Sequence, residues 1–486
     1  MSADPVTRGY ESAVEVGASR TYQPRIFDSP DHPVRLDSLA LLNQGIKDID
    51  LAAPPAVLPD FYHKPLMEMP SSIAVATRDT IRPIFTSAAL NCGMALVGLD
   101  IDRPHETAIR HFYDLVRAAY PYPPDYRRVL SANEVLRCAV EGAAFAVDRY
   151  DLDPAELDRI EEGGQIGVES YGGLPRVRSE LSWMATQLSR IRFGTVGPST
   201  HFVELQQVEE VFDAEVAGKL GVRLGQITLQ YHGGDGVLNI QMGARFGHRL
   251  AGSRPMRAVM AVQKPVYQLA SVRSMRQLRE RIRLYFSGGC PPVPRNSDEG
   301  DRLMLANAVA MNYGFAYRQA TYSTLRRLAR QSFGAGMRLI VDSPHNTMYD
   351  EEVGGAPAVV HRHNSARAFP ASRMRGHRVF ADTGMPLLLP GTNRTSSYLC
   401  VAAEGAGQSL FSASHGTGSI ITDFAKRGLS GPDPQGHTTI KFGYKNTSAA
   451  VVPHLDDNGV NEGLTILAAN QLVRPVARLR PFAVLS

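Results

Sequence analysis

One cysteine and four histidines are the residues of this 486-residue chain whose types could do chemistry together: Cys92, His201, His232, His345 and His415. They lie tens of positions apart, and each is close to the point where an apolar run begins or ends. Strand ends of this kind meet at the rim of a sheet. A thiolate and neutral imidazoles together suit Zn, Mn, Co or Fe, and one thiolate can bridge two ions. The residue types therefore allow a metal centre, although none of the spacings is a local ligand motif.

His415 stands in the stretch "SASHGTGSIITDF", where an apolar run turns on two glycines. Glycines let the backbone approach a bound phosphate, and an imidazole beside them can ligate a metal or attack phosphorus. A histidine in such a turn can equally be a loop residue whose ring bonds to a backbone carbonyl. The stretch alone leaves both interpretations open.

The composition is that of a globular protein. Hydrophobic residues make up 43% and charged residues 21% of the chain, which disfavours the disordered and membrane classes. The first 25 residues lack the basic start and apolar core of a secretory signal, so we expect a cytoplasmic protein that does not contact a membrane. The four cysteines are far apart and form no CxxC pair, so the sequence indicates neither a zinc ribbon nor a disulfide framework.

The elements that must position these side chains are a mixture of helices and strands. Helical periodicity covers residues 105–120 and 132–150, the latter capped by Ser131 or Asn133, and residues 298–334 fit a helix pair or one long helix. Short strands are expected at 200–208, 226–232, 337–343, 356–363 and 385–391. We therefore predict an α+β fold: a flexible extension at residues 1–50, and one large domain at 51–486 with mixed and antiparallel sheets, flanking helices and a helical-hairpin insertion near 299–334.

Four segments, taken in order, carry a resemblance to a known family: "PDFYHKP", "HRHNSARAFP", "LPGTNRTSSYL" and "VARLRPFAVLS". With the cysteine and histidine segments, they resemble the RtcB family of RNA ligases, known as tRNA-splicing ligases, from about Pro54 to the end. The resemblance implies a ligase that uses GTP and Mn to join RNA 3'-phosphate or 2',3'-cyclic phosphate ends to 5'-hydroxyl ends through a histidine-guanylate, in RNA repair or tRNA splicing. The need for an archease-like activator is left open.

The resemblance also implies roles for single residues. Cys92 would bridge two metal ions, with His201, His232 and His345 as further ligands, and His415 would become guanylylated. Contacts to the nucleotide are implied for Glu204, Asn346, Thr392, Thr395, Ser397, Gly416, Gly418 and Tyr444. The Arg-rich segments 273–286 and 322–333 are expected either to contact RNA phosphates or to be solvated helix faces.

The chain departs from the family pattern at several charged positions. Ala89 stands where the family's Asp-x-x-Cys motif has its aspartate, Ser419 where the histidine loop has an arginine, and the chain stops at Ser486 where the family usually ends in Lys-Gly. The alanine at position 89 places one of the two metal sites in doubt. The alternative function is a catalytically altered relative, acting either as an RNA-binding protein or as a metal-dependent phosphoesterase.

Overall fold

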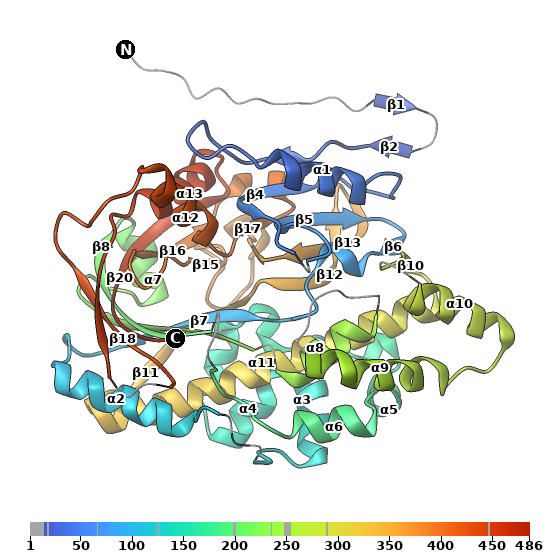
Figure 1. Ribbon diagram of the computed structural model, residues 1–486, viewed down its shortest axis with the longest axis horizontal. Coiled ribbons are helices and arrows are strands. Elements are labelled where there is room, and N and C mark those ends of the chain that lie inside the picture. Colours follow the sequence, from blue (N-terminus) through green and yellow to red (C-terminus); the bar gives the residue numbers. More distant parts are fainter. Residues whose placement is uncertain are drawn as a thin grey trace.

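The computed structural model describes residues 14–16, 19–65, 67–123, 125, 127–197, 201–234, 236–246, 254–287, 290–445 and 448–486 (Figure 1). The helices are α1 Leu36–Gly45, α2 Glu106–Ala119, α3 Ala132–Glu141, α4 Ala143–Tyr150, α5 Gly173–Glu180, α6 Trp183–Ser189, α7 Ala214–Leu220, α8 Val237–Arg245, α9 Arg254–Leu269, α10 Met275–Phe286, α11 Asp298–Phe333, α12 Gly418–Arg427 and α13 Asn458–Ala469. The strands are β1 Val14–Val16, β2 Ser19–Thr21, β3 Arg25–Ile26, β4 Ala56–Tyr62, β5 Ser71–Thr77, β6 Thr80–Ile81, β7 Gly93–Leu99, β8 Val203–Val211, β9 Ile227–Gly233, β10 Val293–Pro294, β11 Met337–Pro344, β12 Asn346–Val353, β13 Ala356–His363, β14 Ser365–Arg367, β15 Pro386–Leu389, β16 Ser397–Ala402, β17 Ser412–Ser414, β18 Thr438–Phe442, β19 Ala450–Pro453 and β20 Val473–Leu485.

Two mixed sheets organise the described residues. The larger has nine strands, in the order β11-β7-β9-β8-β20-β16-β15, with β18 pairing to β20 and β19. The smaller has five strands, in the order β12-β13-β5-β4-β3. Most neighbours are antiparallel, whereas β18 with β20 and β3 with β4 are parallel. The predicted α+β fold with mixed and antiparallel sheets is confirmed.

Helices cover the larger sheet because its central strands are apolar on both faces. In β7, Ala95, Val97 and Leu99 pack in the same core cluster as Met311 and Phe315 of α11. The alternate residues, Met94 and Leu96, pack in a different cluster with side chains of α7. Successive side chains of a strand point to opposite faces, so this continuous apolar run is that of a strand buried on both sides.

The segment predicted as a helix pair or one long helix is a single helix. α11 runs without interruption across the range where a hairpin insertion was expected, so that position of the hairpin is wrong. Ser297 caps its start, and Gly334 ends it in the left-handed conformation at φ 68°. No proline lies between them, and most of its side chains are buried among α2, α3, α4 and α8, which keeps the helix continuous. Two other consecutive helices, α9 and α10, lie beside one another at the right edge of Figure 1.

Part of the predicted N-terminal extension is packed on the domain. β3 pairs with β4, and Leu42 and Ile46 of α1 are buried in a cluster with residues of β4 and β5. Residues 25–50 are therefore held by the smaller sheet rather than loosely attached, whereas residues 1–13, 17 and 18 lie outside the described residues. The boundary at residue 51 stays a prediction. Among the described helices, none has the length and apolar character that a membrane span requires.

Candidate metal centre

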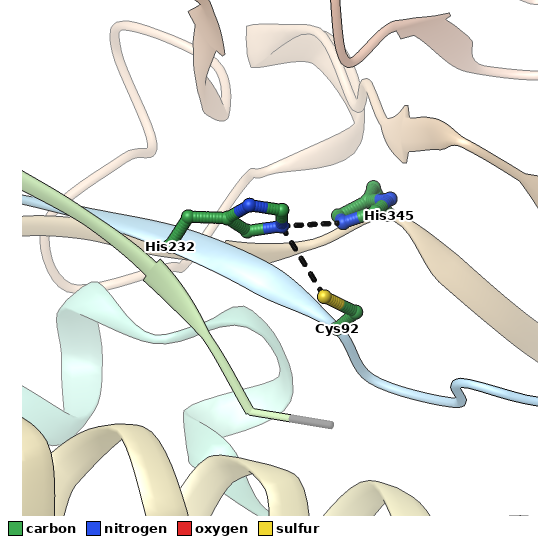
Figure 2. Close-up of side chains that lie close together, drawn as sticks. All are labelled: Cys92, His232 and His345. Carbon is green, nitrogen blue, oxygen red and sulfur yellow. Dashed lines mark hydrogen bonds between the residues drawn. The ribbon is translucent and has the colours of Figure 1, made fainter. Parts of the chain in front are cut away.

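Strand register brings Cys92, His232 and His345 to one end of the larger sheet. Gly93 of β7 pairs with Gly233 of β9 on one side and with Pro344 of β11 on the other. Cys92 directly precedes β7, and His345 directly follows β11. Figure 2 shows the three side chains pointing toward one another from these strand ends. The convergence expected from strand-end residues is thus present in the fold.

The distances between these side chains suit one metal ion bound by all of them. Cys92 Sγ lies 3.2 Å from His232 Nε2 and 3.7 Å from His201 Nε2, and His232 Nε2 lies 3.1 Å from His345 Nε2. The side chains of Cys92, His232 and His345 are buried, and one ligand atom from each lies within 4.8 Å of the others. His345 Nδ1 is also buried, with no hydrogen-bond partner among the described residues. A sulfur and imidazole nitrogens aimed at one point are a donor set that fits a divalent first-row metal.

A short two-stranded sheet places His415 against this group. Ser365 of β14 pairs with Ser414 of β17, and the Ser365 amide donates to the His345 carbonyl at 2.9 Å. His415 directly follows β17, so its ring stacks on His345, with centroids 3.5 Å apart and ring planes at 7°. Four imidazoles and one thiol from distant segments therefore meet in one place.

Burial keeps the stacked imidazoles neutral. Removal from water lowers the pKa of His415 to about 3. Burial, followed by the nearby His415 and His232, holds the pKa of His345 well below its ordinary value. A neutral imidazole has a free lone pair, which a metal ligand and a nucleophile both require. His345 and His415 are therefore neutral at pH 7.

A buried arginine fixes the turn that presents Cys92. Arg318 of α11 donates from Nε to Asp342 at 2.7 Å, from Nη1 to the Asn91 carbonyl at 2.5 Å and from Nη2 to Asn91 Oδ1 at 2.8 Å. Asn91 has φ 57°, a left-handed conformation that asparagine tolerates better than most residues. Its Nδ2 donates to the Met311 carbonyl. Arg318 is 227 positions away from Asn91, so no local pattern in the sequence reveals this arrangement.

The position of the family's aspartate offers no carboxylate. The Ala89 carbonyl accepts from the Cys92 amide at 3.2 Å and from Asn346 Nδ2 at 3.3 Å, so this residue shapes the turn through its backbone. The Asn91 amide group is already bonded to Arg318 and Met311 and does not replace the missing carboxylate. Among the described residues, the candidate ligand atoms next to Cys92 are therefore the imidazole nitrogens of His201 and His232.

The loop that carries Thr392, Thr395 and Ser397 lies against the His415 turn. Thr392 and Thr395 bond to each other, with the Thr392 amide 2.8 Å from Thr395 Oγ1, and the Gly391 amide donates to Ser397 Oγ at 3.1 Å. Thr417 Oγ1, two residues after His415, donates to the Pro390 carbonyl at 2.6 Å. The two loops that the resemblance assigns to the nucleotide are therefore in contact.

An aspartate faces the glycines of the His415 turn. Gly418 begins α12, and Asp60 Oδ1 accepts from the amide of the next residue, Ser419, at 2.9 Å and from its hydroxyl. A Cβ at Gly416 would lie 3.0 Å from Asp60 Oδ2, so the absence of a side chain lets the turn approach this carboxyl. Burial raises the pKa of Asp60, which the hydrogen bonds from Ser419 oppose. Asp60 lies within the quoted "PDFYHKP" segment, but the sequence analysis gave it no role.

The other predicted nucleotide residues are bonded within the protein. Burial raises the pKa of Glu204 in β8 to about 8, and its Oε1 accepts from Gln206 at 2.7 Å. Asn346 Oδ1 accepts from the Asn364 amide at 2.9 Å. Tyr444 donates to the Val196 carbonyl at 3.1 Å. Tyr444 also lines a surface pocket whose other residues are Ala119, Tyr120, Pro121, Tyr122, Asp125, Arg192, Thr195, Val196 and Gly197.

The Arg-rich helices turn only some arginines outward. In α10, Arg276, Arg279 and Arg283 are exposed, whereas Arg281 is buried and donates to Glu299 at 2.6 Å. In the last part of α11, Arg327 and Arg330 are exposed. Arg281 is therefore a core residue, and the phosphate contacts predicted for these helices depend on the exposed arginines.

The sequence of this chain is similar to those of a known protein family. A family model described as tRNA-splicing ligase RtcB matches residues 51–486. The tRNA-splicing ligase RtcB of Archaeoglobus fulgidus is 30% identical over 358 residues, which are 70% of this chain and 67% of that protein. The RNA-splicing ligase RtcB of Mycobacterium bovis is 27% identical over 348 residues, 68% of this chain and 72% of that protein. For the tRNA-splicing ligase RtcB of Pyrococcus horikoshii the identity is 28% over 351 residues, 68% of this chain.

The chain spans only 36% of the length of the Pyrococcus horikoshii relative. The family model nevertheless matches most of this chain, which shows its membership. The chain belongs to the RtcB family.

Proposed function

We propose that this protein is an RNA ligase that uses GTP to join RNA 3'-phosphate or 2',3'-cyclic phosphate ends to 5'-hydroxyl ends. The observation that carries the proposal is the stacking of His415 on His345, 3.5 Å between centroids, beside the Cys92 thiol. A neutral imidazole at the edge of a metal-ligand group is suited to accept a phosphoryl group. Family membership supports the same reaction class.

A divalent ion such as Mn²⁺, held by Cys92, His232 and His345 with His201 beside them, would neutralise phosphate oxygens. The His415 lone pair attacks the α-phosphorus of GTP, so that an N–P bond forms and pyrophosphate leaves. An oxygen of the RNA 3'-phosphate then attacks that phosphorus and takes the guanylyl group from the imidazole. A 5'-hydroxyl finally displaces GMP and seals the strand. A cyclic phosphate is first opened by water.

The protein's other contribution is positioning, which phosphoryl transfer needs more than a strong acid or base. We assign Gly416, Gly418, Thr392, Thr395 and Ser397 to the phosphates of the nucleotide because their loops touch through Thr417. Glu204, Asn346 and Tyr444 are assigned to the rest of the nucleotide on the family resemblance alone. An archease-like protein is the partner to test as an activator.

The test is a joining assay with an RNA that carries 3'-phosphate and 5'-hydroxyl ends, in the presence of GTP and Mn²⁺. The wild type is expected to give a sealed product, and His415→Ala none. His377→Ala is the control, because this partly buried histidine has no role in the proposed reaction and its Nδ1 accepts from the backbone amides of Val379 and Phe380. Failure of the wild type with metal bound, or joining by His415→Ala, would contradict the proposal.

A metal-dependent phosphoesterase is the second candidate, and Ala89 is the observation that favours it. Without a carboxylate beside Cys92, the site keeps imidazole and thiol ligands but has one charged ligand fewer. The same assay separates the two functions. If the RNA loses its 3'-phosphate without being joined, the protein is a phosphoesterase. If the protein binds the RNA but neither joins it nor removes its 3'-phosphate, the protein is an RNA-binding relative.

A further inference from the structure

A second group of metal-ligand residues lies outside the site described above, at the base of the β18–β19 hairpin. Asp433 and His437 precede β18, and His454 directly follows β19. One ligand atom from each of these three side chains lies within 4.8 Å of the others. None of the three has a part in the proposed ligation chemistry.

The backbone holds these residues in fixed positions. The His454 amide donates to the His437 carbonyl at 2.9 Å, and the Asp433 amide donates to the His454 carbonyl at 3.2 Å. The hairpin itself is joined to the larger sheet, because Ile440 and Phe442 of β18 pair with Ala483 and Leu485 of β20. The side chains are therefore presented by a rigid part of the fold, as a ligand site needs.

The donors are arranged as in a carboxylate–histidine ligand pair. Asp433 Oδ2 lies 2.6 Å from His437 Nδ1 and also accepts from the His437 amide at 2.9 Å. This bond orients the ring, and the opposite nitrogen, Nε2, lies 3.5 Å from Glu209 Oε1 of β8. A carboxylate bonded to one imidazole nitrogen is the usual support of a metal-bound histidine, so Nε2, on the side of Glu209, is the His437 nitrogen that would bind an ion.

His454 supplies the independent sign of a missing ligand. His454 is 2% exposed, and its Nδ1 is buried without a hydrogen-bond partner among the described residues. Its other nitrogen, Nε2, lies 2.6 Å from Thr439 Oγ1. Buried polar atoms are nearly always paired, so an unpaired imidazole nitrogen within a group of ligand side chains requires an explanation.

The charges around the group permit a cation. The partly buried Arg480 acts electrostatically on His454, but its Nη2 lies 2.9 Å from Glu209 and 3.1 Å from Asp457, so two carboxylates offset its charge. Asp433 is left to balance an added positive charge. The donors are nitrogen and oxygen, without sulfur, which distinguishes this group from the Cys92 centre.

We propose that Asp433, His437 and His454 form a second, structural site for a divalent first-row metal, which ties the loop before β18 to the end of β19. Two imidazoles and carboxylate oxygen suit Zn²⁺, so Zn²⁺ is the probe. A bound ion would connect residues that the backbone already brings together, and would stabilise the hairpin on the sheet without entering the reaction.

The full chain is dialysed against Zn²⁺, and the zinc bound per chain is then measured by elemental mass spectrometry. Cys92→Ser is expected to reduce zinc at the first centre but to retain about one ion per chain. Adding His437→Ala or His454→Gln should remove that ion or weaken its binding by roughly tenfold or more. His377→Ala in the same background is the matched control and should retain it. His437 is partly exposed, so its replacement tests the site even where the buried His454→Gln fails to fold.

Cobalt gives a second readout that does not depend on counting ions. Co²⁺ at the Cys92 centre has a sulfur ligand and a thiolate-to-metal absorption band, whereas Co²⁺ at the hairpin site does not. Cobalt that binds to Cys92→Ser without this band and is displaced by Zn²⁺ supports the proposal. It is overturned if Cys92→Ser binds no zinc, or if His437→Ala binds as much zinc as its parent and as tightly.

Discussion

Replacement of Arg318 by methionine should separate the stability of the fold from the affinity of the metal centre. Arg318 and Asp342 are both fully buried. The guanidinium makes three of its hydrogen bonds to Asp342 and Asn91, and Gln319 Nε2 donates to the second oxygen of Asp342 at 3.1 Å. Methionine fills much of the same volume but donates nothing. Asp342 then loses its charge partner, and both Asn91 oxygens lose their donor.

The cost can be estimated from the ion pair. Removal of one partner from a buried pair destabilises a protein by about 3–5 kcal/mol, because the remaining charge is uncompensated. Burial already raises the pKa of Asp342, and Arg318 opposes this rise, so the carboxyl would take up a proton more readily in the variant. Arg318→Met should therefore lower the free energy of unfolding by about that amount.

The metal affinity should fall for a different reason. Asn91 is held at φ 57° directly before Cys92, and Arg318 provides two of its hydrogen bonds. Loss of the groups that orient a ligand typically costs 10–100-fold in metal affinity. The assay is competition with a chromogenic chelator for Zn²⁺ or Mn²⁺, run beside urea unfolding.

A double variant distinguishes the two effects. Arg318→Met with Asp342→Leu removes the unpaired charge and should recover much of the lost stability. It should not recover metal affinity, since Asn91 still lacks its donor. A single variant whose metal affinity stays within twofold of the wild type would refute the positioning role. Recovery of affinity together with stability would show that Arg318 acts only through the fold.

Two further predictions concern stability. Burial lowers the pKa of His361 from its ordinary 6.5 to about 4. Between pH 6.5 and pH 4 the unfolded chain therefore binds a proton at this histidine and the folded chain does not, so the fold loses stability as the pH falls through this range. The free energy of unfolding should fall by about 3 kcal/mol from pH 7 to 4 through this group, and His361→Gln should lose that part of the slope in urea titrations. Gly142→Ala should destabilise by about 2 kcal/mol or more, because Gly142 has φ 59° and a Cβ there would lie 2.1 Å from the Gly164 carbonyl. Gly163→Ala, with φ 60° but open space, is the control for strain alone and should cost less in the same thermal melts.

Local signals explain which elements could be predicted. Ser131 does cap α3, in a capping box with Glu134, as its position before an apolar periodic run indicated. The predicted helix at 132–150 is instead two helices, because Gly142 adopts a conformation that only glycine tolerates, and periodicity does not report φ. The hairpin predicted near 299–334 is wrong because Gly300 and Gly314 do not interrupt α11; they lie where the helix packs closely on Pro294, Arg295 and Asn91.

The candidate site could be predicted only in part. Chemistry-bearing residues at strand ends were recognisable, and Cys92, His232, His345 and His415 do meet, although their roles stay predictions. Arg318 could not be found, because its partners are determined by how a long buried helix crosses the sheet. The Asp60 carboxyl beside Gly416 also depends on contact between β4 and α12, which are more than 350 positions apart. Long-range contacts of this kind leave no spacing in the sequence.

The most direct test of the central claim is the intact mass of the protein after incubation with GTP and Mn²⁺. One added guanylyl group is expected on the wild type and on His377→Ala, and none on His415→Ala or Cys92→Ser. An unmodified wild-type chain with metal bound, or an adduct that persists on His415→Ala, would contradict the claim that His415 is the nucleotide carrier of this metal centre.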